Sequence, residues 1–347
     1  MAKSKVQRKK QPAATAPAAG DDSLRIAIAT ALLDGEGPAA LADRLIAEGH
    51  PASAARYEVE RAVKSPYLKA ATRLNARLAK RDWTLGVFSR LAQLDPDRAR
   101  IPTIDKIDPD IFYRDFYLTN RPVKLTGLVD HWPALERWSL DHFDATLGDT
   151  IVELQGDREA DPDFEIAKDP HQMRAPLRDV TRRLRTETGN DFYLTAYNSG
   201  INKQALAPLW ADIAPISILA QREPRDGFFW MGPKGTITPY HHDLTNNLLL
   251  QIVGRKRIKM VAAHDGPLMR NILHCFSDWD GEDLEAGEAT PGRPRVLDCT
   301  IGPGEALFLP IGWWHHVEGL DMTIGMSFTN FRLFNDFQTG YTSYGAM

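Results

Sequence analysis

The sequence of 347 residues has little of what several classes of protein require. It contains only two cysteines, Cys275 and Cys299, which lie far apart and form no C-x-x-C pair. This usage is unlike a disulfide-stabilised domain and is typical of a reducing compartment, so we expect a cytoplasmic protein. No stretch approaches the roughly 18 consecutive apolar residues that a membrane-spanning helix needs, so we expect no membrane partner.

The signatures of several enzyme classes are missing as well. The sequence has no G-x-S-x-G elbow of a serine hydrolase, no phosphate-binding P-loop and no G-x-G-x-x-G dinucleotide fingerprint. Its basic first residues are followed by alanine and proline rather than by an apolar core, so no secretory signal is expected. A net charge of −4 gives no global attraction to nucleic acid or to an anionic membrane.

The chain begins with a basic segment and continues with a helical pattern. Residues 1–21 contain four lysines and one arginine among alanine and proline, and are predicted to form a disordered tail, which is more often a solvated leader than a nucleic-acid contact. Residues 22–100 carry apolar side chains at helical spacing, separated by glycine and proline, and are predicted to be helices. We hypothesise that this helical region supports a homodimer. Apolar side chains expected to pack in its last helix are Leu68, Ala71, Leu74, Leu78, Trp83 and Leu85.

Residues 101–347 form a second predicted domain, with a barrel core at about 228–330. It opens with a short strand at 122–127, a helix at 140–147 and one or two helices within 206–222. Short strands with glycine or proline between them then predict a double-sheet barrel, of mainly β class with flanking helices. The predicted strands are 228–231, 236–242, 247–253, 255–262, 295–301, 305–310, 313–319 and 322–329. An acidic, glycine-rich insert at 263–294 is expected to be a lid, a binding loop or disordered.

Two histidine pairs on these strands suggest a metal site. Side chains alternate along a strand, so His241 and Asp243 share one face while His242 points away. The second pair, His315 and His316, offers a third ligand from a later strand. Two histidines and one carboxylate make a facial triad that leaves metal positions open, as in non-heme Fe(II) oxygenases. The alternative is that these histidines belong to the surface or to a hydrogen-bonded core.

Polar residues on inward faces of two neighbouring strands support the metal site. Strand parity places Lys256 beside Ile258 and Met260, on the apolar side, where a lysine needs a buried anion. A dicarboxylate cosubstrate would supply that anion, and the alternative is an ion pair with a buried acidic residue. Asn247 and Gln251 share a face in the same way, and their amides can bond to metal ligands or to cosubstrate oxygens.

Taken with their order and spacing, several motifs resemble those of the JmjC hydroxylases, a group of cupin-like proteins that includes arginyl and asparaginyl hydroxylases. The resemblance covers about 101–334 and implies a double-stranded β-helix flanked by helices. The stretches that carry it are RPVKLTGLVDHWPALERWSL, FYLTAYN, WMGPKGTITPYHHD (which begins at Trp230), NNLLLQIVGRKRIK and GPGEALFLPIGWWHHVEGLDMTIGMSF.

The resemblance implies roles for individual residues. His241, Asp243 and His315 match the iron ligands of the family, and His315 is preferred to His316 because the family's ligand directly follows the aromatic pair. For the cosubstrate 2-oxoglutarate, the residues implied are Lys256 for the far carboxylate, Thr238 and Tyr193 as its hydrogen-bonding partners, and Asn247 nearby, with Gln251, Ser327 and Trp230 as secondary positions. Ser327 departs from the asparagine that the family often has on the last barrel strand.

The implied reaction is that of a 2-oxoglutarate-dependent dioxygenase, with Fe(II) as cofactor and 2-oxoglutarate and O₂ as cosubstrates. It requires no acid–base pair, so no catalytic residue is assigned beyond the iron site. The expected substrate is a protein or peptide side chain, because the acidic insert suits a basic partner. The alternatives are an oxygenase acting on tRNA or other nucleic acid, a demethylase of methyl-lysine, and a cupin that binds ligands without catalysis.

Overall fold

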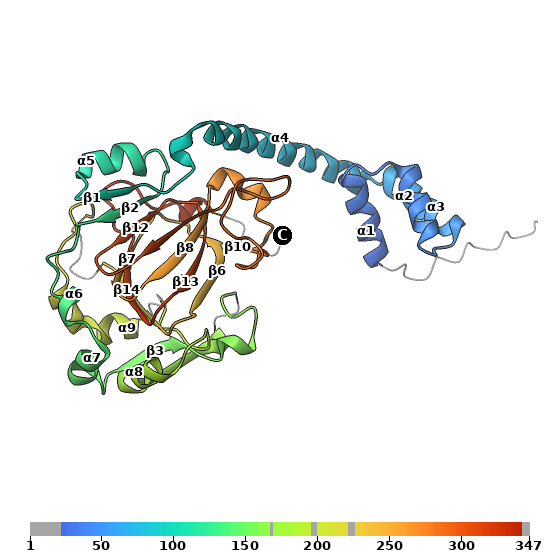
Figure 1. Cartoon of the computed structure of the whole chain (residues 1–347). Coiled ribbons are helices and arrows are strands. Elements are labelled where there is room, and N and C mark those ends of the chain that lie inside the picture. The colour runs from blue at the N-terminus through green and yellow to red at the C-terminus, as the bar shows by residue number, and fades with distance from the viewer. Residues whose placement is uncertain (1–21, 167–168, 196–199, 221–225, 342–347) are drawn as a thin grey trace, which may run out of the picture. The chain divides into compact units, whose positions relative to one another are not determined.

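The computed structural model describes residues 22–166, 169–195, 200–220 and 226–341 (Figure 1). The predicted basic tail, residues 1–21, lies outside the described residues. The chain divides into two compact units, 1–84 and 85–347, so the unit that holds the barrel begins inside helix α4 (Pro66–Leu94). None of the helices in the described residues is long and apolar enough to cross a membrane.

The first unit is helical, as predicted. Helices α1 (Asp22–Leu33), α2 (Pro38–Ala47) and α3 (Ala52–Lys64) bury a small core around Ile28, Leu41 and Val59. Pro38 and Pro66 each stand at the first position of a helix, where a missing backbone N–H costs nothing. The expectation that α4 packs is wrong for the described residues, because α4 has no buried side chain and Trp83 is 68% exposed. Helical spacing reveals an apolar stripe but not what covers it.

Two six-stranded sheets form the barrel of the second unit (Figure 1). The first has the strand order β1-β2-β12-β7-β14-β5, and the second has the order β11-β8-β13-β6-β10-β9. All eight predicted barrel strands are present, with ends shifted by at most two residues. The strands are β1 (Thr103–Asp105), β2 (Val123–Thr126), β5 (Phe228–Gly232), β6 (Ile237–His242), β7 (Asn247–Val253), β8 (Lys256–Val261), β9 (Asn271–Leu273), β10 (Phe276–Ser277), β11 (Leu297–Ile301), β12 (Ala306–Leu309), β13 (Trp314–Gly319) and β14 (Thr323–Phe328).

Strand alternation divides the apolar residues among three layers. On β7, Leu248 and Leu250 belong to the large core outside the first sheet, whereas Leu249 belongs to the core inside the barrel, with Ile258 and Met260 of β8. A third cluster covers the outer face of the second sheet. Because every second side chain of β6, β7, β8 and β13 points inward, these strands decide which polar groups face the barrel interior.

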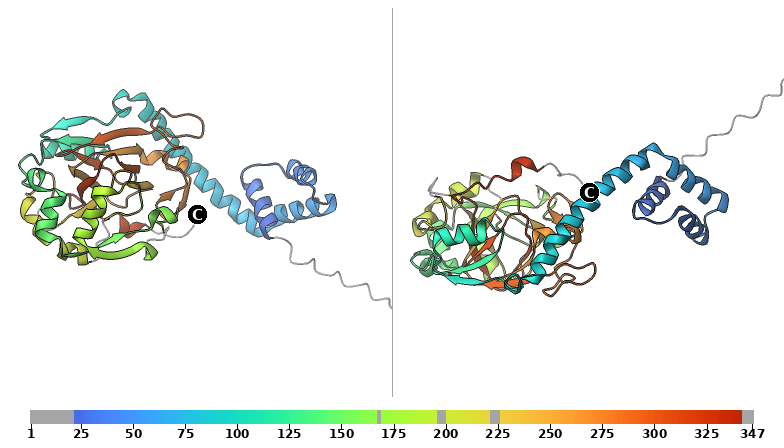
Figure 2. Two further views of the ribbon diagram at one scale, coloured as in Figure 1. Left: turned by 60° about the horizontal axis from the view of Figure 1, so that its bottom comes forward. Right: turned by 90° about the horizontal axis from the view of Figure 1, so that it is seen from above.

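Helices and a small hairpin gather on one side of the two sheets (Figures 1 and 2). They are α6 (Ala134–Arg137), α7 (Leu140–Leu147), β3 (Ile151–Gln155), β4 (Gln172–Pro176), α8 (Leu177–Thr186) and α9 (Gly200–Ala205). Helix α5 (Pro109–Phe112) lies at the opposite end of the sheets, near β1 (Figure 1). Helix α7 matches its prediction, and the hydroxyl of Ser139 caps it by accepting a hydrogen bond from the His142 amide at 3.1 Å. The one or two helices expected within 206–222 are wrong for the described residues 206–220, apart from a short 3₁₀ helix at Ala207–Asp212, and Pro215 follows that helix.

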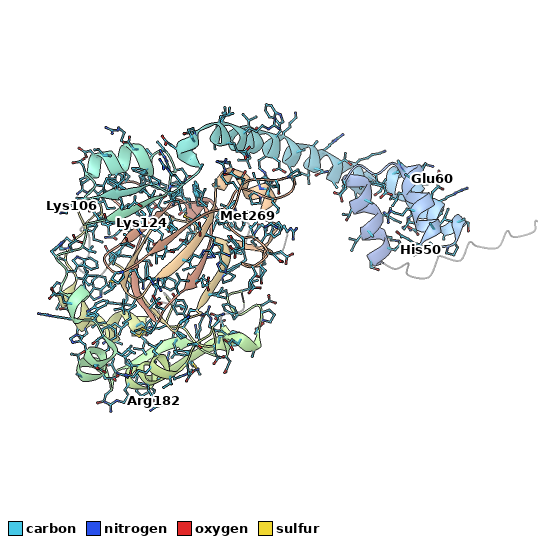
Figure 3. The ribbon with its side chains drawn as sticks, in the orientation of Figure 1. His50, Glu60, Lys106, Lys124, Arg182 and Met269 are labelled. Carbon is cyan, nitrogen blue, oxygen red and sulfur yellow. The ribbon has the colours of Figure 1, made fainter. Side chains whose placement is uncertain are left out.

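The insert at 263–294 is a packed extension of the second sheet. Strand β10 pairs with β6, and Trp279 and Leu284 are buried against Tyr240 and Met269, the last of which is labelled in Figure 3. The acidic, glycine-rich composition of the insert gave no sign that these few apolar residues would be buried. Part of its negative charge is also neutralised, because Glu285 pairs with Lys259 and Arg257, and Glu288 pairs with Arg295.

Replacing Gly281 by alanine is expected to destabilise the protein by about 1–3 kcal/mol, the usual cost of overpacking. A Cβ at this position would lie 2.3 Å from Nε2 of the buried His316, so the insert and β13 would have to move apart. Thermal denaturation would measure the effect. Gly287→Ala is the matched control in the same insert, because a Cβ there meets no atom within 4 Å. Equal melting temperatures for the two variants would contradict the packing of the insert.

Candidate metal and cosubstrate site

Pairing of β6 with β13 places two histidines side by side inside the barrel. His241 and His315 are register partners, and their ring centroids are 4.2 Å apart. Asp243 follows the end of β6 and returns to the face of His241, as strand parity predicts. One ligand atom from each of the three residues lies within 4.8 Å of the others, close enough to hold one metal ion.

The backbone fixes the orientation of both imidazoles. Nδ1 of His241 lies 2.8 Å from the Pro239 carbonyl oxygen, and Nδ1 of His315 lies 3.0 Å from that of Trp313. Each Nδ1–H therefore donates to a carbonyl, which leaves the Nε2 lone pair free for a metal. The amide of Asn247 donates to Oδ2 of Asp243 at 3.1 Å, so the carboxylate is oriented in the same way.

Burial sets the protonation states that a metal needs. Desolvation, with a contribution from His241, lowers the pKa of His315 to about 4, so its imidazole is neutral at pH 7. Burial alone would raise the pKa of Asp243, but the neighbouring histidines and the Asn247 amide outweigh it and the net shift is downward. A neutral imidazole and an ionised carboxylate are the forms that bind metal.

The second histidine of each pair packs away from this site. His242 lies edge-on to Trp314 with ring centroids 4.7 Å apart, and His316 packs against Tyr240 at 5.3 Å. Burial lowers the pKa of His316 to about 4, so it stays neutral behind the insert. Among the described residues, the group that could hold a metal includes His315 and not His316.

A cavity with about 410 Å³ of empty space, open to solvent, lies beside the three candidate ligands. Most of the residues that the sequence proposes for a cosubstrate line it. Gln251 does not, because its amide donates to the carbonyl oxygens of Val253 and Ile324 at the bulge of β14. Its role as a secondary site residue is therefore not supported by its position. The lining residues are Tyr193, Trp230, Thr238, His241, Asp243, Asn247, Leu249, Lys256, Leu309, His315, Val317 and Ser327.

Lys256 is the cation of this cavity. Its side chain is only 3% exposed, and Nζ donates to the Tyr193 hydroxyl at 3.0 Å. Nζ also lies 5.6 and 5.8 Å from the ring centroids of Tyr193 and Trp230. No ion pair among the described residues includes Lys256, so the alternative of a structural pair with a buried acid finds no partner there. An anionic ligand in the cavity would provide the missing charge.

Ser327 and Trp230 form one wall of the cavity. The Trp230 indole N–H donates to the Ser327 hydroxyl at 2.8 Å across the pair β14–β5. Ser327 therefore fills the position where the resemblance predicts an asparagine, and it is held by an aromatic neighbour rather than left free. Tyr193 faces this wall, with its ring centroid 5.7 Å from that of Trp230.

Arg158 is a residue of this region that the sequence does not reveal. It is fully buried, donates to Glu165 at 3.0 Å and to the Ile237 carbonyl at 2.8 Å, and lies 5.1 Å from the Tyr193 ring centroid. Arg158 thereby connects the start of β6 with Tyr193, the residue that accepts a hydrogen bond from Lys256. No periodicity marks a single arginine in an irregular segment, so only the tertiary structure could identify it.

Comparison with known proteins supports an oxygenase site. The sequence profile described as "Cupin-like domain" matches residues 109–336. Lysine-specific demethylase 8 of Xenopus tropicalis is 28% identical over 227 residues, which are 62% of this chain and 49% of that protein. The human bifunctional peptidase and (3S)-lysyl hydroxylase JMJD7 is 28% identical over 270 residues, 66% of this chain and 83% of that protein. The tRNA wybutosine-synthesizing protein 5 of Gallus gallus is 24% identical over 253 residues, 68% and 79% respectively. The chain spans about half the length of the demethylases that it matches.

Proposed function

The chain belongs to the cupin-like domain family, among its JmjC-type oxygenases, and on this premise we propose that it is an Fe(II)- and 2-oxoglutarate-dependent dioxygenase that hydroxylates a side chain of a protein or peptide. The donor set supports iron, because two imidazoles and one carboxylate on one side of a metal leave its other positions open. His241, Asp243 and His315 would hold the metal.

The environment of Lys256 is the main observation in favour of 2-oxoglutarate as the cosubstrate. A buried lysine that faces a cavity and has no carboxylate partner among the described residues suits a ligand with a free carboxylate. 2-Oxoglutarate has one carboxylate for Lys256 and a 2-oxo acid group for the metal. Thr238 lines the same cavity and would share the far carboxylate with Lys256 and Tyr193.

Bound Fe(II), with 2-oxoglutarate and O₂, would supply the oxidation of a C–H bond to an alcohol while 2-oxoglutarate is converted to succinate and CO₂. The protein's own part is to bind and to orient. Backbone carbonyls and Asn247 hold the ligand side chains in place. Leu249, Leu309 and Val317 give the cavity an apolar wall that limits the entry of water.

The names of the relatives support a protein substrate over a nucleic acid. Two of the three relatives described above are named for lysine chemistry, and one for tRNA modification. Exposed acidic residues of the insert, such as Asp278 and Glu282, follow β10 in the chain, and β10 pairs with the strand of His241. They would favour a basic peptide. A tRNA substrate remains the second candidate, and removal of an N-methyl group from lysine the third.

The first experiment is to purify the protein anaerobically with Fe(II), add 2-oxoglutarate and O₂, and follow succinate. Slow formation of succinate without any substrate is expected, and its rate should rise with a basic peptide. Formaldehyde release would identify a demethylase, and stimulation by tRNA alone would identify the second candidate. Absence of succinate together with absence of 2-oxoglutarate binding would leave a cupin that binds other ligands and would overturn the proposal.

We also propose that the protein is a homodimer and that helix α4 forms its interface. Seven large apolar side chains of this helix are at least 48% exposed: Tyr67, Leu74, Leu78, Trp83, Phe88, Leu91 and Leu94. A second copy would cover them. Analytical ultracentrifugation should show a dimer that Trp83→Glu weakens, whereas Lys80→Glu on the same helix, an exposed charge, should leave it intact. A monomeric parent protein would contradict this role of α4.

A further inference from the structure

A second cavity, of about 500 Å³, shares no lining residue with the cavity of the candidate metal site. Its lining includes four arginines and one carboxylate. The arginines come from separate parts of the chain, two following α4, one preceding β2 and one preceding β11, and they are Arg98, Arg100, Arg121 and Arg295. The carboxylate is Asp265, in the turn that ends at Met269, which is labelled in Figure 3. The fold thus brings four guanidinium groups to one hollow of a protein whose net charge is −4.

Arg121 has unused hydrogen-bonding capacity. Its Nη2 donates to the Asp97 carbonyl at 2.7 Å, but its Nε is buried without a hydrogen-bond partner. No ion pair among the described residues includes Arg121, although Phe116 lies under the guanidinium at 5.9 Å. A buried N–H without an acceptor is unfavourable, and an arginine fork is shaped to bind the oxygens of a phosphate or carboxylate.

The other arginines have partners that a ligand can replace. Arg98 pairs with Asp95 at 3.4 Å, Arg100 with Asp97 at 4.0 Å, and Arg295 with Glu288 at 2.8 Å. All three acidic side chains are solvent-exposed, Glu288 by 73%, and such pairs contribute little to stability. Burial lowers the pKa of the neighbouring His264, so this imidazole adds no charge at pH 7. Asp265 is the one lining group that opposes an anion.

A flat apolar wall completes the cavity. Trp313 is buried, and its indole N–H donates to the carbonyl and side-chain oxygens of Asn120 at 3.0 and 2.8 Å. Leu297 and Ala262 line the hollow with it. Asn120 precedes Arg121, so the indole and the guanidinium of Arg121 are positioned by the same turn. The carbonyl of Trp313 also orients His315, so this wall is shared with the candidate metal site.

We propose that this cavity is a binding site for a small organic phosphate, whose phosphate group contacts Arg121 and Arg98 and whose aromatic or apolar body lies against Trp313. Several guanidinium groups favour phosphate over carboxylate, because a phosphate offers three acceptor oxygens and up to two negative charges.

Isothermal titration calorimetry with phenyl phosphate tests the site, with phenol and benzoate as the neutral and carboxylate analogues. Phenyl phosphate should bind, phenol should not, and benzoate should bind more weakly. Arg121→Gln should weaken phenyl phosphate by about tenfold or more, as expected for loss of a charged hydrogen bond. Arg90→Gln, an exposed arginine of α4 outside the cavity lining, is the matched control and should bind like the parent.

Two further measurements separate loss of the binding site from loss of stability and from effects of the other cavity. If Arg121→Gln lowers the melting temperature, Arg98→Gln, which removes a half-exposed side chain, should give the same loss of affinity in a stable protein. Lys256→Ala and saturating 2-oxoglutarate should leave phenyl phosphate binding unchanged, because they act on the other cavity. Competition with 2-oxoglutarate, equal affinity in the arginine variants and the parent, or tighter binding of benzoate would each overturn the proposal.

Discussion

The His241→Ala variant is expected to lose Fe(II) and, with it, all formation of succinate. His241 supplies one of three ligand atoms that lie within 4.8 Å of one another, and alanine offers no replacement. Changes to outer groups that merely orient metal ligands typically cost about 10- to 100-fold in affinity, so removal of a ligand should exceed that. Metal content measured by mass spectrometry after anaerobic loading would give the stoichiometry directly.

His242→Ala is the matched control, because His242 is the next residue along β6 and faces Trp314 rather than the candidate ligands. This variant should retain about one Fe(II) per chain, even if the loss of packing lowers its melting temperature. The comparison therefore separates ligation from general loss of structure. If both variants lose iron equally, the assignment of faces along β6 is wrong; if neither does, the metal is held elsewhere.

The barrel was predictable because its strands carry a strong local signal. Strand alternation has a period of two residues, so a short segment such as 247–253 reveals which side chains share a face without knowledge of what they contact. This is why the sequence could place His241 with Asp243, and Lys256 with Ile258. Among the elements that it missed, β3 and β4 form a separate two-stranded sheet outside the barrel. Helix α8 did carry a helical signal, because its buried Leu177, Val180 and Leu184 stand at positions i, i+3 and i+7, and the prediction overlooked it.

Periodicity also fails to show what covers a face, and Lys259 is the clearest example. Strand alternation places it on the face of β8 opposite Lys256, together with Arg257, and two charged side chains on one face predict an outer side. Lys259 is nevertheless only 3% exposed, because the insert folds over it and provides the Gly281 carbonyl and the Glu285 carboxylate. The same limit explains α4, whose apolar stripe was recognised but has no cover among the described residues.

Strand β8 has two buried lysines on opposite faces, Lys256 towards the cavity and Lys259 towards the insert. The Lys256→Ala variant should raise the KM for 2-oxoglutarate by about 10- to 100-fold, with a smaller effect on kcat. A hydrogen bond to a charged group is worth about 1.5–3 kcal/mol, and each 1.4 kcal/mol corresponds to tenfold in affinity. The far carboxylate takes no part in the bond changes, so its loss should weaken binding more than turnover. Steady-state succinate formation at varied 2-oxoglutarate would measure both constants.

Lys259→Ala should have the opposite profile. This variant loses the contact with Glu285 and the anchor of the insert, so its melting temperature should fall while the KM for 2-oxoglutarate stays near that of the parent. Lys256→Ala, in contrast, should not lower the melting temperature of the ligand-free protein, because it removes a buried lysine that no carboxylate of the described residues neutralises. A raised KM in both variants, or in neither, would mean that Lys256 does not bind the cosubstrate. A fall in melting temperature for Lys256→Ala alone would indicate that this lysine stabilises the barrel instead.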